Sequence, residues 1–323
     1  MSYRMCARIV FPATRNREEL TVSLVNSVKI ESSWKQLTDT AEVVLPKKIR
    51  ILSGQKFDEI FKAGDPVRIE LGYNKQLHTE FTGYLKRVSC GIPVTLLCED
   101  EMYKLKRNTV SVSIKNAKLE DLLKKIAPGY ETDCYEGVEL GTVRYTNVTA
   151  AQVLEDIQKK TGLRSYFDGK VLRCGNIYAD QENIKPVKIV LERNAISESL
   201  NQNSASEYEV KVKAISLLKG GKKIEAEAGD SNGTLQTLTY VGIEAKAVLK
   251  KIAEKDYKRL KAKGFDGKIE LFGIPRVQHG MRVELESRIC KDYNGTYVVD
   301  SVTKEFGDNA TYRQSVELGN KLE

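Results

Sequence analysis

Two strand pairs of similar sequence, one near each end of the chain, most constrain the fold. The first is GDPVRIELGYNKQLHTEFTGYLKRVS at residues 64–89, and the second is HGMRVELESRICKDYNGTYVVDSVTKEF at 279–306. In the first, Val67, Ile69 and Leu71 alternate with polar residues, which predicts strands with one buried and one solvated face. A chain that repeats such a pair is expected to contain two similar β modules.

The residues around the first pair also predict β structure. Short β-branched runs at 7–11, 27–32 and 41–46 are separated by turn residues, and another strand is expected at 93–100. Residues 72–78 are expected to break the first strand of the pair. Such a series of short strands is typical of a small β-barrel, so we predict a first barrel domain at 1–107.

The hydrophobic period changes in the middle of the chain, which predicts an α/β insert at 108–180. A strand at 110–115 is expected to lead into a helix capped by Asn116, with Leu119, Leu122, Leu123 and Ile126 on its apolar face. A second strand at 142–148 is followed by TAAQ, whose Thr149 and Gln152 have the spacing of a capping box. A hairpin is predicted about Asp168 and Gly169.

After a polar linker at 178–186, a second barrel domain is predicted at 181–323. It begins with a hairpin that turns at Gly220 and Gly221 and continues into a loop at 229–234. One long helix is expected at 243–263, followed by four strands. The fold class is therefore mainly β with an α+β insert: two similar small β-barrel modules, a strand–helix middle domain and one long helix.

Sequence motifs give no sign of an enzyme. Hydrophobic residues make up 41% of the 323 residues, which suffices for several cores, and no apolar run approaches the ~20 residues that would cross a bilayer. The N-terminus lacks the apolar stretch of a signal peptide, and the six cysteines form no CxxC pair, so reduced thiols are expected. His78 and His279 are expected in solvated loops, outside any metal or catalytic motif. We therefore predict no catalytic, metal-binding or cofactor-binding residues.

Structural roles are assigned to a few positions only. Trp34, the single tryptophan, follows a strand and is predicted to anchor an interface or a core. Turn-shaping roles in the barrels are expected for six residues: Gly64, Asp65, Gly72, Gly83, Gly280 and Gly295.

Positive charge is concentrated on the predicted long helix. The net charge is +8, and residues 243–264 contain KAVLKKIAEKDYKRLKAKG, rich in lysine. A basic face can neutralise phosphates, which makes a nucleic-acid-binding β-barrel protein the main alternative function. However, Glu254 and Asp256 lie among the lysines, and the only aromatic residue, Tyr257, lies on the apolar stripe. A solvated outer helix explains this pattern better.

In its ordered set of segments the chain resembles the baseplate hub proteins of contractile-tailed phages, the late-control family, which is similar to the N-terminal part of type VI secretion spike proteins. The segments are FKAGDPVRIELGYN…EFTGYLKRV…VTLLCEDEMYKLK (61–106), NVTAAQVLEDIQKKTGLRSYFDGKVLRCG (147–175) and AEKDYKRLKAKGFDGKIELFGIPRVQHGMRVELES…YNGTYVVDSVTKEF…YRQSVELG (253–319). Together they cover most of the chain; their order and spacing carry the resemblance.

The resemblance implies a structural, non-enzymatic role. Such hubs are homotrimers in which each chain contributes two similar barrels, so a ring of near six-fold symmetry joins a hexameric tail tube above to a trimeric spike below. The implied partners are the tube protein, the spike protein and other baseplate proteins, and DNA or effectors would pass through the pore without specific binding. The implied location is a virion tail baseplate or an injection apparatus assembled in the host bacterial cytoplasm, with no membrane insertion. A cell-wall hydrolase carried by a tail is the second alternative.

Overall fold

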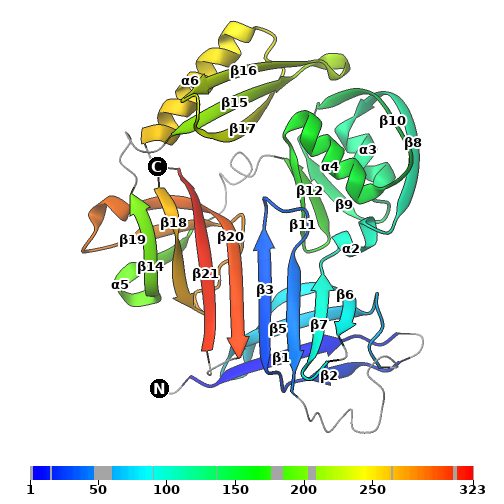
Figure 1. Cartoon of the computed structure of the whole chain (residues 1–323), viewed down its shortest axis with the longest axis vertical. Coiled ribbons are helices and arrows are strands. Elements are labelled where there is room, and N and C mark those ends of the chain that lie inside the picture. The colour runs from blue at the N-terminus through cyan, green and yellow to red at the C-terminus, as the bar shows by residue number, and fades with distance from the viewer. Residues whose placement is uncertain are drawn as a thin grey trace.

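A computed structural model describes residues 3–14, 17–46, 60–89, 91–135, 137–175, 185–202, 209–262, 265–307 and 311–322. The chain is mainly β, as predicted. A thirteen-stranded sheet crosses the molecule from β14 to β2, and three smaller sheets lie above it (Figure 1). The described strands of the large sheet form no closed barrel, because its path ends in two different strands.

The first module contributes seven strands to this sheet. They are β1 (Met5–Phe11), β2 (Leu20–Val22), β3 (Ser27–Ser33), β4 (Thr40–Leu45), β5 (Pro66–Tyr73), β6 (Gln76–Ser89) and β7 (Val94–Glu99). The pairing order is β3-β4-β7-β6-β5-β1-β2. Alternating residues such as Ile9, Ile69 and Leu96 point into one shared core, as the period-two pattern predicts.

The hairpin between β5 and β6 is tighter than predicted. The expected break at 72–78 is wrong, because β5 continues to Tyr73 and β6 begins at Gln76. Asn74 and Lys75 form the turn with positive φ angles of 52° and 67°, the backbone of a two-residue hairpin. His78 consequently lies in β6, not in a loop.

The second module contributes six strands. They are β13 (Val187–Val190), β14 (Ala195–Gln202), β18 (Phe265–Phe272), β19 (Arg282–Glu286), β20 (Gly295–Gly307) and β21 (Thr311–Lys321). Strands β14, β18, β21 and β20 are neighbours in that order, β19 pairs with β20, and β13 pairs with β19. A short helix, α5 (Leu191–Asn194), connects β13 to β14.

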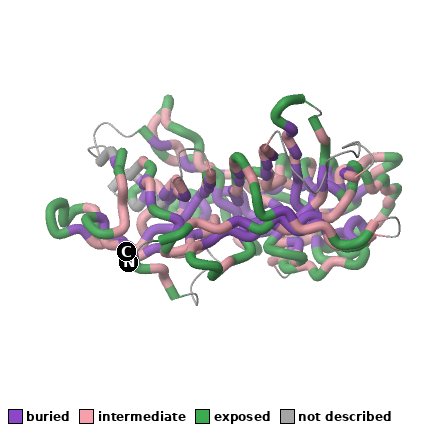
Figure 2. The backbone as a smooth tube through the Cα atoms, turned by 90° about the horizontal axis from the view of Figure 1, so that it is seen from below, coloured by how far each residue is buried: buried purple, intermediate pink, exposed green. Residues whose placement is uncertain are grey.

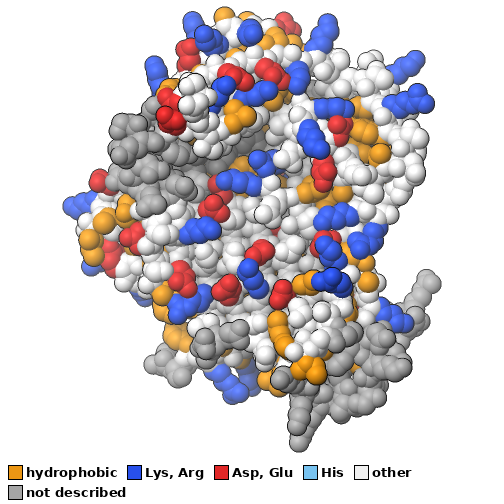
Figure 3. All heavy atoms as spheres, in the orientation of Figure 1, with side chains coloured by type: hydrophobic (Ala, Val, Ile, Leu, Met, Phe, Trp, Pro, Cys, Tyr) orange, Lys and Arg blue, Asp and Glu red, His pale blue; other side chains and the backbone are white. Residues whose placement is uncertain are grey.

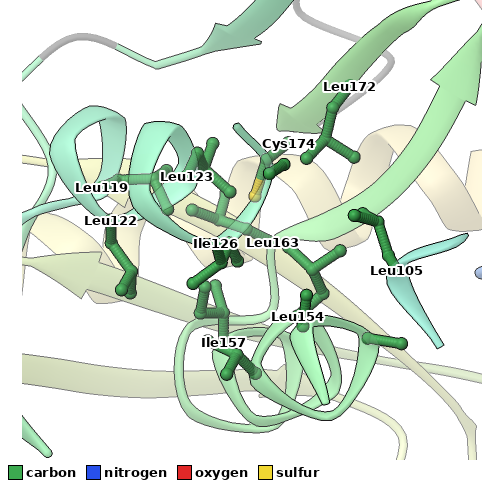
Figure 4. Close-up of a cluster of buried hydrophobic side chains, with 14 of the residues drawn as sticks. Leu105, Leu119, Leu122, Leu123, Ile126, Leu154, Ile157, Leu163, Leu172 and Cys174 are labelled. Atoms are coloured by element: carbon green, nitrogen blue, oxygen red, sulfur yellow. The ribbon is translucent and has the colours of Figure 1, made fainter. Parts of the chain in front are cut away.

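The middle segment is an α/β insert, as predicted. Its elements are α2 (Met102–Leu105), β8 (Thr109–Lys118), α3 (Leu119–Ile126), β9 (Glu131–Cys134), β10 (Glu139–Thr149), α4 (Ala150–Thr161), β11 (Arg164–Asp168) and β12 (Val171–Gly175). The apolar faces of α3 and α4 pack in one core (Figure 4). The capping box is confirmed, since Gln152 N donates to Thr149 Oγ1 and Thr149 N to Gln152 Oε1. Asn116 as the α3 cap is wrong: it lies inside β8, and Lys118 precedes the helix.

A second α/β unit interrupts the second module between β14 and β18. It consists of β15 (Val210–Leu217), β16 (Lys223–Gly229), β17 (Thr234–Val241) and α6 (Lys246–Ala262). Strand β17, which runs parallel to β15, was not predicted. The unit packs on the middle segment: Ile215 and Leu217 join the core of α3 and α4, and Thr239 Oγ1 donates to Thr161 O at 2.7 Å.

The two modules follow the same strand pairing path. In chain order, β1, β3, β4, β5, β6 and β7 correspond to β13, β14, β18, β19, β20 and β21, and each set is paired as first-fourth-fifth-sixth-third-second. One difference is orientation, because β1 is antiparallel to β5 whereas β13 is parallel to β19. Viewed from below, buried backbone continues from one module into the other (Figure 2). The domain boundaries at 107 and 180 remain predictions.

Candidate functional site: the junction of the two modules

The modules are joined by direct strand pairing between β3 and β20. The register is antiparallel and runs from Ser33 opposite Ser301 to Val28 opposite Phe306. Each module thus lends one strand to a continuous sheet, and Phe306 is buried in the core of the first module. The junction therefore shares both a hydrogen-bond ladder and apolar packing.

Two glycines shape the same turn in both modules. Gly64 N donates to Leu85 O at 2.7 Å, and Leu85 N donates to Asp65 O at 2.8 Å. In the second module, Gly280 N donates to Val299 O at 2.8 Å, and Val299 N donates to Met281 O at 2.9 Å. Both glycines have positive φ, 95° and 78°, which favours glycine at these positions. Leu85 and Val299 are therefore equivalent residues.

A β-bulge follows at the same place in each module. The register between β6 and β7 shifts between Leu85 and Arg87, and that between β20 and β21 shifts between Val299 and Ser301. The strand beyond each bulge is thereby redirected. In β20 this redirected half is the part that pairs with β3. The sequence similarity of the two strand pairs thus reflects a shared turn and a shared bulge.

The other predicted turn residues occupy different environments. Gly72 and Gly83 lie inside β5 and β6, where an added Cβ would come within 1.9 Å of Gln76 O and 2.1 Å of Glu99 O, respectively. These glycines permit close backbone approach within strands instead of forming turns. Gly295 begins β20 opposite Leu285, and Asp65 accepts from Arg17 Nη1 at 3.2 Å.

Trp34 lies where the two modules meet the middle segment. Its side chain is only 7% exposed and packs with Tyr166 of β11 and Val298 of β20. Trp34 Nε1 donates to Asp300 Oδ1 at 2.9 Å, and Lys35 Nζ lies 2.6 Å from Asp300 Oδ2. Asp300 occupies the bulge of β20. The indole therefore connects three parts of one chain.

A second polar connection crosses the junction at Glu80, whose side chain is 1% exposed. Its carboxylate accepts from Lys304 Nζ and, at 3.1 Å, from Arg276 Nε, while Arg276 Nη2 donates to Thr79 O at 2.6 Å. This group was not predicted. The available signal was the alternation of Val302, Lys304 and Phe306, which puts Lys304 on the buried face of its strand.

The solvent-facing side of the sheet at this junction carries alternating charges. Glu42 lies opposite Lys29, Lys29 opposite Glu305, and Glu305 opposite Arg313. These four residues, one from each of four neighbouring strands, form one row of alternating charge across the sheet. Opposite charges at paired positions stabilise a sheet. The row borders an open polar groove of about 400 Å³ lined by Ser197, Glu198, Ser199, Lys268, Glu270, Thr303, Glu305, Arg313 and Ser315. Figure 3 shows Lys, Arg, Asp and Glu intermixed over this face.

His279 differs from the prediction, because it is largely buried. Its Nε2 lies 3.4 Å from Asp39 Oδ2, and its ring contacts Tyr166 edge-on. Asp39 N donates to the buried Asp100, whose pKa is raised well above its ordinary value by burial and by the nearby Asp39 charge. Within the described part of the chain, no three potential metal-ligating side chains converge.

The basic helix α6 packs one face on β15 and β16, with Leu249, Ala253 and Leu260 buried. Val248, on the same helix, is 50% exposed. Asp256, expected among the solvated charges, is buried and accepts a hydrogen bond from the Tyr240 hydroxyl. Lys263, the predicted end of the helix, lies outside the described residues. Among the described helices, none is long and apolar enough to span a bilayer.

Sequence comparisons identify no relative: no family model and no curated protein matches the chain. Comparison with solved structures, in contrast, finds proteins of similar fold. A tail protein from Neisseria meningitidis MC58 superposes with a TM-score of 0.63 at 15% identity, covering 99% of this chain and 97% of its own. The 43 kDa tail protein of prophage MuSo2 from Shewanella oneidensis gives a TM-score of 0.62 at 15% identity, with 97% of each chain covered.

The chain has the fold of phage tail proteins. This tail-protein fold extends to secretion machinery, because an Escherichia coli component of the type VI secretion system, described as structurally similar to T4 bacteriophage tail proteins, superposes with a TM-score of 0.56 at 9% identity. That match covers 93% of this chain and 74% of the other. The resemblance inferred from the sequence is confirmed at the level of the fold.

Proposed function

We propose that this chain is the structural hub of a contractile tail baseplate or of a tail-like injection system. Three copies would form a ring of near six-fold symmetry between a hexameric tail tube and a trimeric spike. Each chain would supply two of six similar faces, so a three-chain ring can meet six tube subunits. The turn-shaping glycines and Trp34 would serve this architecture by fixing the modules and their junction.

The observation that carries the proposal is the repetition of one pairing path within one chain. The two modules share strand order, the Gly64 and Gly280 turns and the bulge that follows. They are joined in the same sheet by β3 and β20, so one step of a head-to-tail repeat is already present inside the chain. A fold likeness to tail proteins of nearly the same length supports the assignment.

The remaining parts of the proposal follow from this role. The domains at 1–107 and 181–323 would form the ring wall, and the insert at 108–180 would lie outside it. The tube, the spike and other baseplate proteins would be the partners, and DNA or effectors would pass through the pore. The chain would break no bond and insert into no membrane, and it would assemble in the host bacterial cytoplasm before joining the tail or injection apparatus.

The mass in solution tests this proposal. Light scattering at rising concentration is expected to give three times the chain mass of 36.3 kDa. Negative-stain images of the same sample should show closed rings of three chains with six peripheral lobes. A chain that stays monomeric at the highest concentration, or one that forms dimers, would contradict the ring.

The main alternative is a nucleic-acid-binding protein that uses helix α6. Five of its lysines, Lys246, Lys250, Lys251, Lys255 and Lys258, are exposed, which is the observation in its favour. Binding would show a strong dependence on salt. A fluorescence anisotropy titration of labelled single-stranded DNA at low salt decides between the hub and the nucleic-acid-binding protein, and we expect no binding.

A peptidoglycan zymogram tests the second alternative, a cell-wall hydrolase carried by a tail, and we expect no clearing.

A further inference from the structure

Each module carries one half of a strand junction like the one that joins them. Inside the chain, β20 of the second module pairs with β3 of the first. The equivalent of β20 in the first module is β6, and the equivalent of β3 in the second module is β14. These two strands lie toward opposite sides of the molecule (Figure 1). They are therefore the matching halves of a junction that one chain cannot complete.

The register of this second junction follows from the first. Leu85 corresponds to Val299 through the shared turn and bulge, so Ser89 corresponds to Thr303. On the other side of the junction, Lys29 lies opposite Glu42 of β4 and Ser199 lies opposite Lys268 of β18. Glu42 and Lys268 hold the same place in the two pairing paths, so Lys29 and Ser199 are equivalent. Asn201 therefore corresponds to Glu31. Since Glu31 lies opposite Thr303 inside the chain, Asn201 should lie opposite Ser89 of another chain.

Both edges are available for pairing. In the described part of the sheet, β14 has a strand partner on one side only, β18. Among the described strands, residues 87–89 of β6, beyond the bulge, pair with β7 alone, whereas the same half of β20 also pairs with β3. Unpaired edges promote pairing with another chain unless Pro or Lys blocks them, and the β14 sequence AISESLNQ contains neither. Ile92, beyond the end of β6, is 80% exposed.

We infer that β14 of one copy of this chain pairs antiparallel with the end of β6 of the next copy, with Asn201 opposite Ser89. This inference rests on the proposed ring and names the strands that close it. The contact is head-to-tail, so it forms a ring only if the rotation closes. Tyr293, whose hydroxyl donates to Leu200 O at 3.2 Å, does not oppose the pairing, because a carbonyl oxygen accepts two hydrogen bonds.

Cysteine cross-linking tests the register directly. Two single variants, Ser89→Cys and Asn201→Cys, are prepared in full-length chains from which the native cysteines that could interfere have been replaced by serine: Cys6, Cys90, Cys134 and Cys290. Each is oxidised alone and as a mixture, then separated on a non-reducing denaturing gel. A head-to-tail contact predicts covalent dimers from the mixture and none from either variant alone. The double variant should give a trimer as its largest product.

Two matched pairs control the experiment. Glu31→Cys with Thr303→Cys occupies the equivalent junction inside the chain, so it should oxidise without any increase in mass. Ser197→Cys mixed with Ser89→Cys is out of register by four residues on the same strand and should cross-link at least tenfold more slowly. The internal pair shows that the oxidation works, and the shifted pair shows that mere proximity is insufficient.

The outcomes separate this inference from the proposed function. A trimer by mass that forms no Ser89→Cys–Asn201→Cys cross-link overturns the inference and leaves the ring standing. A monomer by mass without cross-links overturns both. A ladder of covalent products beyond the trimer supports the strand pairing and overturns the closed ring. Dimers from a single variant would show a two-fold contact and overturn the inference.

Discussion

Lys304 and Glu80, on strands from different modules, form an ion pair in which the side chains are only 3% and 1% exposed. Burial lowers the pKa of Lys304, and Glu80 partly offsets that effect by favouring the charged ammonium. Arg276 adds a second cation to the same carboxylate. The two modules are therefore held together by the ion pairs of Glu80 with Lys304 and Arg276 as well as by the β3–β20 ladder.

Glu80→Gln should strongly destabilise the chain, because it leaves Lys304 buried without its counter-charge. Breaking a buried pair costs about 3–5 kcal/mol of unfolding free energy. The double variant Glu80→Gln/Lys304→Met should recover much of the loss, since no fully buried charge remains unpaired and Arg276, whose side chain is 34% exposed, keeps access to water. Urea denaturation of the single and double variants measures both effects.

A surface pair provides the control for that cycle. Lys124 and Glu120 form an exposed ion pair four residues apart on α3. Glu120→Gln should leave the unfolding free energy almost unchanged, because solvent and salt screen an exposed helix pair of this kind. Equal losses at Glu80 and Glu120 would contradict the special role of the buried pair.

Asp100 should make the stability depend on pH in an unusual direction. Its pKa is raised in the folded state, so between 3.8 and that higher value the folded chain binds more protons than the unfolded chain. The contribution of Asp100 to the unfolding free energy is therefore fully present below 3.8 and is lost as the pH rises through the folded-state pKa. Denaturation curves from pH 3.8 upward should show this loss in the wild type.

Asp100→Asn removes the titration and supplies the comparison. The variant also loses one acceptor, because the wild-type carboxylate receives hydrogen bonds from both Asp39 N and Met102 N. It should therefore be less stable overall, but the difference from the wild type should be largest at acid pH. A difference that stays constant, or that grows toward pH 8, would show that Asp100 does not titrate as inferred.

The sequence predicted the elements whose signals are local. The capping box at Thr149 and the alternating strands were found because each depends on a few neighbouring residues. The turn at Asn74 and Lys75 was misplaced, since neither residue is glycine and Gly72 appeared to be the stronger break. Strand β17 was missed because the loop signal before it obscured a short apolar run.

The features of the junction could not be predicted in the same way. Lys304 is buried because Glu80 meets it from a strand 224 positions away, and nothing near either residue in sequence indicates that partner. Asp256 is likewise buried against Tyr240, although its neighbours on α6 are exposed lysines. The repeated strand pair did indicate two modules. Their common pairing path and the β3–β20 ladder required the structure.

Gly83→Ala should disrupt the first module, because its added Cβ would come within 2.1 Å of Glu99 O, a backbone atom that cannot move without shifting β7. Overpacking of this kind costs about 1–3 kcal/mol or more of unfolding free energy. Gly91→Ala is the matched control, since its nearest atom would lie 3.6 Å away. Thermal unfolding should show a lower Tm for the first variant and little change for the second.

Trp34→Phe should loosen the connection between modules without removing the apolar packing. The variant keeps an aromatic ring beside Tyr166 and Val298 but loses the hydrogen bond to Asp300, which is worth about 1.5–3 kcal/mol because the acceptor is charged. The unfolding free energy should fall by this amount. Asp300→Asn retains an acceptor for the indole and should cost less at this contact, although it loses the ion pair with Lys35.

The single tryptophan also reports whether the modules unfold together. Because Trp34 touches both modules and the middle segment, its fluorescence should change at the same urea concentration as the circular dichroism of the whole chain in the wild type. In Glu80→Gln, where a second connection between the modules is weakened, the fluorescence transition should come first. Coincident transitions in that variant would mean that the β3–β20 ladder, with the Trp34 and Phe306 contacts, suffices to keep the two modules cooperative.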